Sequence, residues 1–427
     1  MPAAEAPPRR ALGAWLEALE RAHVREIDLG LERVRRVWAA LGAPRVGRRV
    51  ITVAGTNGKG STVHALEALG RAHGLRTATT TSPHLQRFNE RIRIDGAEAS
   101  DGTIVEAFER IERARIGLAG GPVSLTYFET AILAALLIMA DAGPDLAVLE
   151  VGLGGRLDAV NVVDCDLAVV TPVDLDHQAW LGSDRETIGA EKAGVLRPGC
   201  PVVISDPAPP ASVLERAAAL AAPVLRIGVD FACDGDRYTG AAAAGLGPCE
   251  LSGLGAPRVH PAALGAALTV LRLVGTDLRL DTVRSALDGL RVPGRMQRLA
   301  HGGTELILDV AHNPHAARAL AAGLPDDGPF ELLFGAFADK DVEGILAPLA
   351  PRLAGITLVD TPGSRGSPAL SLAERLAPLG LPALAAAGSV SGGLDRALAR
   401  AGDRRVLVCG SFTVVGAVLG LVARSEP

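Results

Sequence analysis

The stretch RVITVAGTNGKGSTVHALEALGRAHG, from Arg49 to Gly74, decides the fold of this chain. Its apolar, β-branched run Val50–Val53 predicts a buried strand at Arg49–Ala54, and Val63–His73 has the pattern of a helix that ends at Gly74. Between them lies the glycine-rich segment Gly55–Thr62. A strand, a glycine loop and a helix in this order predict a phosphate-binding loop, because glycines let backbone N–H groups face an anion.

The chemistry of this loop fits the β- and γ-phosphates of ATP. Lys59 can neutralise phosphate charge, and the hydroxyl of Ser61 can hold Mg²⁺. The segment departs from the pattern GxxxxGK[ST], because Val53 takes the place of the first glycine and Gly60 separates the lysine from the serine. A glycine turn that only opens a helix is the structural alternative. The residues assigned to ATP are Gly55, Thr56, Asn57, Gly58, Lys59, Gly60 and Ser61.

Runs like the first strand recur along the chain and alternate with Ala/Leu-rich segments of helical length. These runs are Leu146–Val151, Leu167–Thr171, Val202–Ser205, Leu306–Val310, Ile356–Val359 and Val406–Cys409. Strands that are continuously apolar are typical of a parallel sheet with helices on both faces. The sequence therefore predicts an α/β fold.

The length of 427 residues predicts two domains, because a single core rarely grows beyond about 250–300 residues. The segment RVPGRMQ, Arg291–Gln297, breaks a helical pattern with Pro293 and Gly294 before new strand–helix units begin. We expect domains at residues 1–296 and 297–427, with Ala208–Gly255 as an excursion within the first.

Charge and cysteine content limit the function classes. A net charge of −5 with scattered arginines argues against nucleic-acid binding. No apolar run reaches the roughly 18 residues of a membrane span, and the N-terminus does not resemble a secretory signal. The five cysteines include no CxxC pair, which favours reduced thiols and a cytoplasmic protein.

Lysine is rare in this chain. Only three of the 43 basic residues are lysines, namely Lys59, Lys192 and Lys340. Arginine serves wherever a plain positive charge suffices, so a surviving lysine marks chemistry that a planar guanidinium cannot perform, unless it survives by chance. All three lie in motif-like segments.

A series of motifs in fixed order connects these features. The motifs are AGTNGKGST, TSPHL, SLTYFE, LEVGLGGRLDAVN, LDH, WLG, EKAG, PGR, DVAHNP and GSF. Together, from about Leu12 to Phe412, they resemble the folylpolyglutamate synthase family of the Mur ligase superfamily. The segment IDLGLERV and the SLTYFE motif are similar to its bifunctional bacterial members, which also act as dihydrofolate synthase. The resemblance implies a parallel-sheet ATPase domain of the P-loop type, followed by a smaller Rossmann-like glutamate ligase domain.

The same resemblance implies ATP-dependent amide ligation through an acyl phosphate. L-Glutamate would be joined to 7,8-dihydropteroate, forming dihydrofolate, and to the γ-carboxyl of reduced folates. We expect these small molecules as partners, with no nucleic acid or membrane, and a monomer. Two alternatives stay open: a folylpolyglutamate synthase without the first activity, and a protein in which nucleotide binding drives a conformational change without ligation.

The resemblance also implies two Mg²⁺ sites. Glu150, at the end of an apolar strand, and Ser82 would hold one ion, with Ser61 joining them, and His177 would help to bind the second. Lys192 matches a lysine that CO₂ often converts to N6-carboxylysine, which supports the second ion. The catalytic residues would thus be Lys59, Lys192 and His177. Alternatives are a solvated strand end, a turn serine, a structural histidine and a Lys192–Glu191 surface pair.

Nucleotide and pterin contacts complete the expected site. Arg295 and Asp309 match nucleotide-contacting residues, and Asp309 could accept hydrogen bonds from the ribose. Family members carry Gln and Asn in a helix-opening segment where this chain has His260 and Pro261, so adenine contacts would differ there. The residues that match dihydropteroate-contacting segments are Glu26, Ile27, Asp28, Leu29, Thr126, Tyr127, Phe128, Glu129, Leu157, Asp158 and Ala159. Phe128 offers a stacking face, although core packing is the alternative for Ile27, Leu29 and Phe128.

Overall fold

A computed structural model describes residues 10–23, 27–255, 259–363, 365–381 and 384–425. The chain forms two compact units. The first contains the chain up to Ser82 together with Asn89–Leu290, and the second contains Pro83–Phe88 and the chain from Arg291 onward. The units therefore divide at the start of the RVPGRMQ segment. No helix in the described ranges is both long and apolar enough to cross a bilayer.

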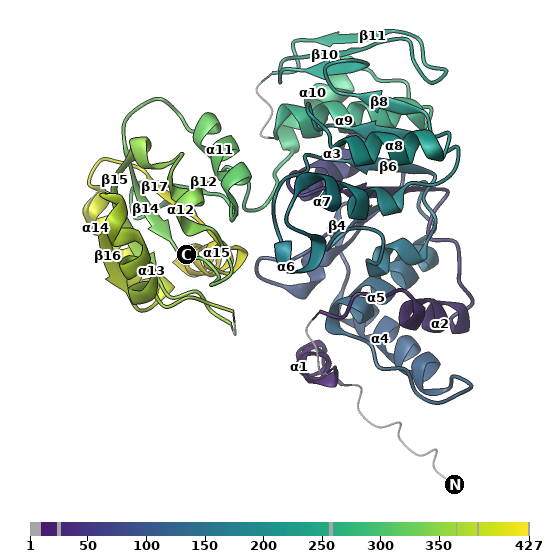
Figure 1. Cartoon of the computed structure of the whole chain (residues 1–427), viewed down its shortest axis with the longest axis horizontal. Coiled ribbons are helices and arrows are strands. Elements are labelled where there is room, and N and C mark those ends of the chain that lie inside the picture. The colour runs from purple at the N-terminus through teal and green to yellow at the C-terminus, as the bar shows by residue number, and fades with distance from the viewer. Residues whose placement is uncertain (1–9, 24–26, 256–258, 364, 382–383, 426–427) are drawn as a thin grey trace. The chain divides into compact units, whose positions relative to one another are not determined.

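An eight-stranded sheet forms the centre of the first unit, with the strand order β4-β3-β2-β5-β1-β6-β7-β8. Figure 1 colours this unit from purple to green and the second unit, from Arg291 onward, from green to yellow. The six strands from β2 to β8 in this order are parallel, and β3 and β4 are antiparallel additions at one edge. The strand bounds are β1 Arg49–Ala54, β2 Thr77–Thr80, β3 Ile92–Ile94, β4 Ala97–Glu98, β5 Leu146–Glu150, β6 Leu167–Val170, β7 Val202–Ile204 and β8 Val224–Arg226. The expected parallel sheet is thus confirmed.

Ten helices accompany this sheet in the described part of the first unit. Their bounds are α1 Leu12–Ala22, α2 Glu32–Ala40, α3 Lys59–Ala72, α4 Asp101–Ile116, α5 Tyr127–Ala142, α6 Gln178–Leu181, α7 Arg185–Lys192, α8 Ala211–Ala219, α9 Pro261–Leu273 and α10 Leu280–Gly289. The excursion at 208–255 contains α8, β8 and a separate antiparallel sheet, whose strands are β9 Phe231–Cys233, β10 Arg237–Gly240 and β11 Cys249–Ser252.

Helix α3 differs from the sequence prediction at its beginning. It starts at Lys59, four residues before the predicted Val63. Gly58 adopts a left-handed conformation with φ 87° and forms the N-cap, so the lysine already belongs to the first helical turn. Gly74 follows the end of the helix with φ 84°, as the sequence predicts.

The second unit has a six-stranded sheet in the order β12-β13-β17-β14-β15-β16, in which only β12 is antiparallel to its neighbour. The strands are β12 Gln297–His301, β13 Thr304–Leu308, β14 Phe330–Phe334, β15 Leu353–Val359, β16 Leu384–Ala387 and β17 Val406–Cys409. The helices are α11 Pro314–Gly323, α12 Val342–Leu346, α13 Ala369–Leu376, α14 Val390–Ala401 and α15 Phe412–Ser425.

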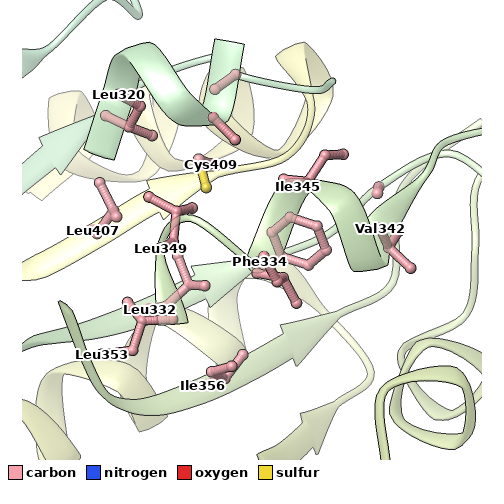
Figure 2. Packing of buried hydrophobic residues seen from close by; sticks show 14 of the residues in the cluster. Leu320, Leu332, Phe334, Val342, Ile345, Leu349, Leu353, Ile356, Leu407 and Cys409 are labelled. Carbon is pink, nitrogen blue, oxygen red and sulfur yellow. The ribbon is translucent and has the colours of Figure 1, made fainter. Parts of the chain in front are cut away.

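Successive residues of β14 and β17 enter different cores, because side chains alternate between the faces of a sheet. Leu332, Phe334 and Leu407 pack against helices α11, α12 and α13 (Figure 2). Leu333 and Val408 belong to the core formed with α14 and α15. Both sheet faces are therefore covered, which explains why these strands are continuously apolar.

Replacing Phe334 by alanine should destabilise the second unit by about 3–5 kcal/mol, because the ring is fully buried and leaves a cavity. Figure 2 shows the ring beside Ile345 of α12. Urea unfolding followed by circular dichroism measures the effect. Leu370→Ala, at a side chain that is 70% exposed in the same unit, is the control and should change stability by less than about 0.5 kcal/mol. Equal effects of the two changes would contradict the assignment of Phe334 to the core.

Candidate active site

The glycine loop after β1 lies against the loop after β6. Thr56 donates its backbone N–H to the carbonyl of Pro172 at 2.9 Å, and its hydroxyl bonds the backbone of Asp174. A Cβ atom at Gly55 would lie 1.8 Å from the Thr171 hydroxyl oxygen, so only glycine fits there. Since β1 and β6 are parallel neighbours, both loops leave the carboxyl edge of the sheet, where α/β proteins bind ligands.

Two lysines meet at one carbonyl group of this loop. Lys59 Nζ lies 3.0 Å from the carbonyl oxygens of Gly55 and Thr56, and Lys192 Nζ lies 2.8 Å from the same Gly55 oxygen. The Lys192 side chain is only 4% exposed. Burial, and then the positive charge of Lys59, lower the pKa of Lys192 to about 7. A substantial fraction of this amine is therefore neutral near pH 7.

The alternative interpretation of Lys192, as the partner of Glu191 in a surface ion pair, is wrong. Glu191 instead pairs with Arg156, with 2.8 Å between the Arg156 Nη2 and a carboxylate oxygen. The Arg156 N–H also donates to the Glu191 carbonyl at 2.9 Å. A Cβ atom at Gly155 would come within 2.9 Å of the Lys192 carbonyl oxygen. The LGGRLD loop, Leu153–Asp158, therefore closely approaches the end of α7, and this places Lys192 in the interior.

Strand register brings Ser82 to Glu150. In the parallel pair of β2 and β5, Thr80 lies opposite Leu149, so the residues that follow are neighbours. The Ser82 N–H donates to Glu150 Oε2 at 3.2 Å, and the Glu150 side chain is 5% exposed. The same oxygen lies 3.6 Å from the position a Cβ atom would take at Gly60, in the first turn of α3. The carboxylate, the TSPHL serine and the phosphate loop therefore form one cluster.

Arg91, which follows β2 in the sequence, is a site residue that sequence reasoning missed. Its guanidinium carbon lies 5.6 Å from the centroid of the Tyr127 ring, and its charge interacts with Glu150. Burial lowers the pKa of Arg91, while Tyr127 and Glu150 act in the opposite direction. In an arginine-rich chain, the sequence offers no signal that separates this arginine from the others.

The donor set fits Mg²⁺. Within the described ranges, no three His, Cys, Asp or Glu residues come together as a metal cluster. Glu150 with the nearby Ser82 and the buried Ser61 offers one carboxylate and hydroxyl groups. Mg²⁺ is bound in this way in ATP-dependent enzymes, through one or two carboxylates, waters and substrate phosphates. His177 lies in the loop after β6, at φ 50°, and Asp176 beside it acts electrostatically on Lys192.

The expected pterin segments come together in the first unit. Phe128 lies against the backbone of Gly152, where an added Cβ atom would lie 2.4 Å from the ring. Asp158 accepts the N–H groups of Leu153 at 2.8 Å and Val160 at 3.0 Å, and burial raises its pKa to about 6. Ile27, Leu29, Phe128 and Leu157 are half-buried, whereas Ala159 is buried. Glu26 lies outside the described residues.

An arginine connects two of these segments. Arg33 Nη1 lies 2.7 Å from Asp28 Oδ2, and its Nη2 lies 2.9 Å from Glu129 Oε1. Thr126 caps α5 by accepting the Glu129 N–H, and the Glu129 carboxylate accepts the Thr126 N–H in return. Asp28 and Glu129 thus belong to one charged network.

The candidates of the second unit gather after β13. Asp309 accepts the N–H groups of Met296 and Ala311, each at 2.9 Å. Burial raises the pKa of Asp309, whereas the positive charge of Arg295 acts to lower it. The guanidinium of Arg295 lies 5.1 Å from the centroid of the Phe412 ring, which is also beside His312. The neighbouring Asn313 is buried as the N-cap of α11. The helix-opening His260 of the first unit is likewise an N-cap, since its Nδ1 accepts the Ala262 N–H.

Known proteins resemble this chain along most of its length. Residues 294–412 match a family model described as Mur ligase, glutamate ligase domain. The dihydrofolate synthase/folylpolyglutamate synthase of Escherichia coli (strain K12) is 39% identical over 415 residues, which is 96% of this chain and 95% of the relative. The protein of the same name from Mycobacterium tuberculosis is 34% identical, with 82% and 79% covered.

Solved structures are similar over the whole chain. One is E. coli FolC in complex with DHPP and ADP, at a TM-score of 0.90 and 38% identity, with 98% of this chain and 99% of that chain covered. Another is the bifunctional folylpolyglutamate synthase/dihydrofolate synthase with Mn, AMPPNP and L-glutamate bound, at a TM-score of 0.88 and 39% identity, with 98% and 100% covered.

Proposed function

Because this chain belongs to the dihydrofolate synthase/folylpolyglutamate synthase family, we propose that the residues of its phosphate loop, metal cluster and pterin segments carry out that family's reaction here. The chain is an ATP-dependent ligase that adds L-glutamate to dihydropteroate and to reduced folates, and it uses a divalent metal ion. The meeting of Lys59 and Lys192 at the Gly55 carbonyl is the observation that carries the assignment of residues.

The reaction needs an activated carboxyl group, since a carboxylate is a poor acylating agent. Transfer of the γ-phosphoryl group of ATP to the substrate carboxylate gives an acyl phosphate, which the amine of L-glutamate attacks, and phosphate leaves. This chemistry depends on positioning and charge neutralisation. Lys59 and the N–H groups of the first turn of α3 supply positive charge at the loop, and Arg295 and Asp309 are proposed to contact the nucleotide.

The metal ions would be held by the donors already described. Ser61, Ser82 and Glu150 would hold one ion, and His177 with a carbamylated Lys192 would hold the second. The bound Mg²⁺ would supply positive charge that neutralises the phosphate groups. The bond from the Ser82 N–H to Glu150 orients the carboxylate, and the tie between Thr56 and Asp174 holds the phosphate loop beside the loop that carries His177.

Carbamylation of Lys192 has support from its surroundings. The neutral amine attacks the carbon of CO₂, an N–C bond forms and one proton is released. Burial supports this step because it enlarges the neutral fraction of the amine. The carbamate carries a negative charge. The repulsion between the ammonium groups of Lys59 and Lys192 thereby becomes an attraction between Lys59 and the carbamate.

Three further parts of the proposal concern the rest of the chain. The half-buried residues near Asp28, Tyr127 and Leu157 would bind the pterin.

Residues 297–427 would serve as the glutamate ligase domain, and residues 1–296 would serve as the ATP- and pterin-binding domain. The family match at 294–412 supports this division. A cytoplasmic location is proposed from the five free cysteines.

Phosphate release from MgATP tests the function directly. We expect release that depends on L-glutamate with 7,8-dihydropteroate and, in a separate assay, with tetrahydrofolate, and products heavier by one glutamyl residue in mass spectrometry. Turnover with tetrahydrofolate alone would leave a folylpolyglutamate synthase without the first activity. ATP binding without turnover of either substrate would point to the nucleotide-driven conformational change instead.

A further inference from the structure

Helix α2 lies where the proposed pterin segments meet. It packs against α5, which begins at Tyr127, and against the short 3-10 helix Ala159–Val162, which Asp158 caps. Val34, Val37 and Trp38 form the buried side of α2. Arg33 is half-buried on the same helix and is not among the residues that the sequence assigns to the substrate.

The side chain of Arg33 joins two segments that are far apart in the sequence. Its Nη1 contacts Asp28 Oδ2 at 2.7 Å, and its Nη2 donates to the Asp28 carbonyl at 2.6 Å. The same Nη2 donates to Glu129 Oε1 at 2.9 Å, across 96 residues of sequence. The other oxygen of Glu129 accepts the Thr126 N–H at 2.8 Å. One guanidinium therefore links the Ile27–Gly30 loop to the first turn of α5.

This link requires the shape of arginine. A guanidinium presents its donors in a planar fork that can reach two acceptor groups at fixed angles, whereas the ammonium of lysine is a single point charge. Glu129 is only 5% exposed, so water screens its pairing with Arg33 weakly. Arg33 Nε is buried and has no acceptor in the described part of the chain. The side chain is thus held by Asp28 and Glu129 and not by a complete set of hydrogen bonds.

We propose that Arg33 is a positioning residue for the pterin substrate. By tying Asp28 to Glu129, it holds the Ile27–Gly30 loop against the end of α5 that carries Tyr127 and Phe128. This inference rests on the proposed function, in which these segments bind the pterin. Its consequence is selective: removal of the link disorganises the pterin side of the site and leaves the phosphate loop, on β1 and α3, intact.

The test compares Arg33→Met and Arg33→Lys with the wild-type protein in steady-state kinetics. For Arg33→Met we expect the KM for 7,8-dihydropteroate to rise about tenfold or more, with the KM for MgATP changed less than about twofold. The KM of Arg33→Lys for 7,8-dihydropteroate should lie within about threefold of the value for Arg33→Met, because one ammonium cannot replace the planar fork of the guanidinium. Arg35→Met, at an exposed arginine on the same helix, is the matched control and should leave both constants unchanged.

Several outcomes would overturn the inference. An unchanged KM for 7,8-dihydropteroate, or equal rises in both KM values, would remove the positioning role. If Arg33→Met does not fold, Glu129→Gln tests the same link with the shape kept, and the same selective rise is expected; its absence counts against the inference. In the double variant that combines Arg33→Met with Glu129→Gln, the KM for 7,8-dihydropteroate should rise little more than in either single variant. Wild-type turnover of 7,8-dihydropteroate is the separate check on the proposed function.

Discussion

Lys59→Ala should lower the rate of phosphate release at least about 10³-fold with either pterin substrate, because the loop loses the cation that faces the transferred phosphoryl group. The ammonium lies 3.0 Å from the carbonyl oxygens of Gly55 and Thr56, so its charge is located at the loop itself. Lys59→Arg should also be inactive or nearly so, since a planar guanidinium does not fit the place of a compact ammonium. The measurement is kcat with MgATP, L-glutamate and 7,8-dihydropteroate.

The control for Lys59→Ala is Arg71→Ala, which removes an exposed cation near the far end of the same helix. It should keep kcat within about twofold of the wild type. Circular dichroism establishes that both variants are folded. Unaltered turnover in a folded Lys59→Ala protein would show that Gly55–Ser61 is a structural turn and not the phosphate loop.

Lys192→Ala should lower kcat at least about 10²-fold, and acetate should restore part of the loss. The physical reason is that the carbamate would contribute a carboxylate-like group beside the second metal ion, and a small carboxylate can enter the space that the truncated side chain leaves. Acetate should not rescue Lys59→Ala, whose missing group is a cation, and this makes that variant the matched control. Full activity of Lys192→Ala without acetate would exclude the carbamate.

The same hypothesis predicts a dependence on pH and CO₂. The pKa of Lys192 lies at about 7, below the ordinary lysine value, so the neutral and reactive amine increases as the pH rises through 7. At pH 8 the neutral fraction of this amine therefore exceeds that of an ordinary lysine, which is well under 1%. Removal of CO₂ should therefore lower activity, and bicarbonate should restore it. A ¹³C resonance of the carbamate after addition of ¹³C-bicarbonate identifies the modified group, and Lys192→Ala should lack it.

Much of the first unit could be predicted because its signals are local. A run such as Val50–Val53 is apolar because both faces of a parallel strand are covered, so composition alone reveals it. In contrast, β14 was not among the predicted strands. Its FELLF sequence contains a charged residue, Glu331, which is buried and has Arg400 of α14 at 2.8 Å as its ion-pair partner. That partner cannot be found from the pattern around Glu331.

The residues of the candidate site also fall into two groups, those that local sequence motifs predict and those that they do not. The order of strand, glycine loop and helix within Arg49–Gly74 identifies a phosphate loop, and the motifs TSPHL, EKAG and DVAHNP identify the family. By itself, however, the sequence left Lys192 open as a surface residue. Arg33 lies within the IDLGLERV segment, but the sequence assigned no role to it or to Arg91. Each of these assignments depends on neighbours that are distant in the chain.

The sequence by itself thus determined the α/β class, the phosphate loop and the family, because each is written in a contiguous segment whose residues act through nearest neighbours. Only the tertiary structure decided that Lys192 is buried beside Lys59, since the LGGRLD loop must first pack on α7. The link from Asp28 through Arg33 to Glu129 likewise exists only after α2 and α5 have packed. Burial and charge proximity are properties of the folded chain, and they set the pKa and the partners on which the proposed chemistry depends.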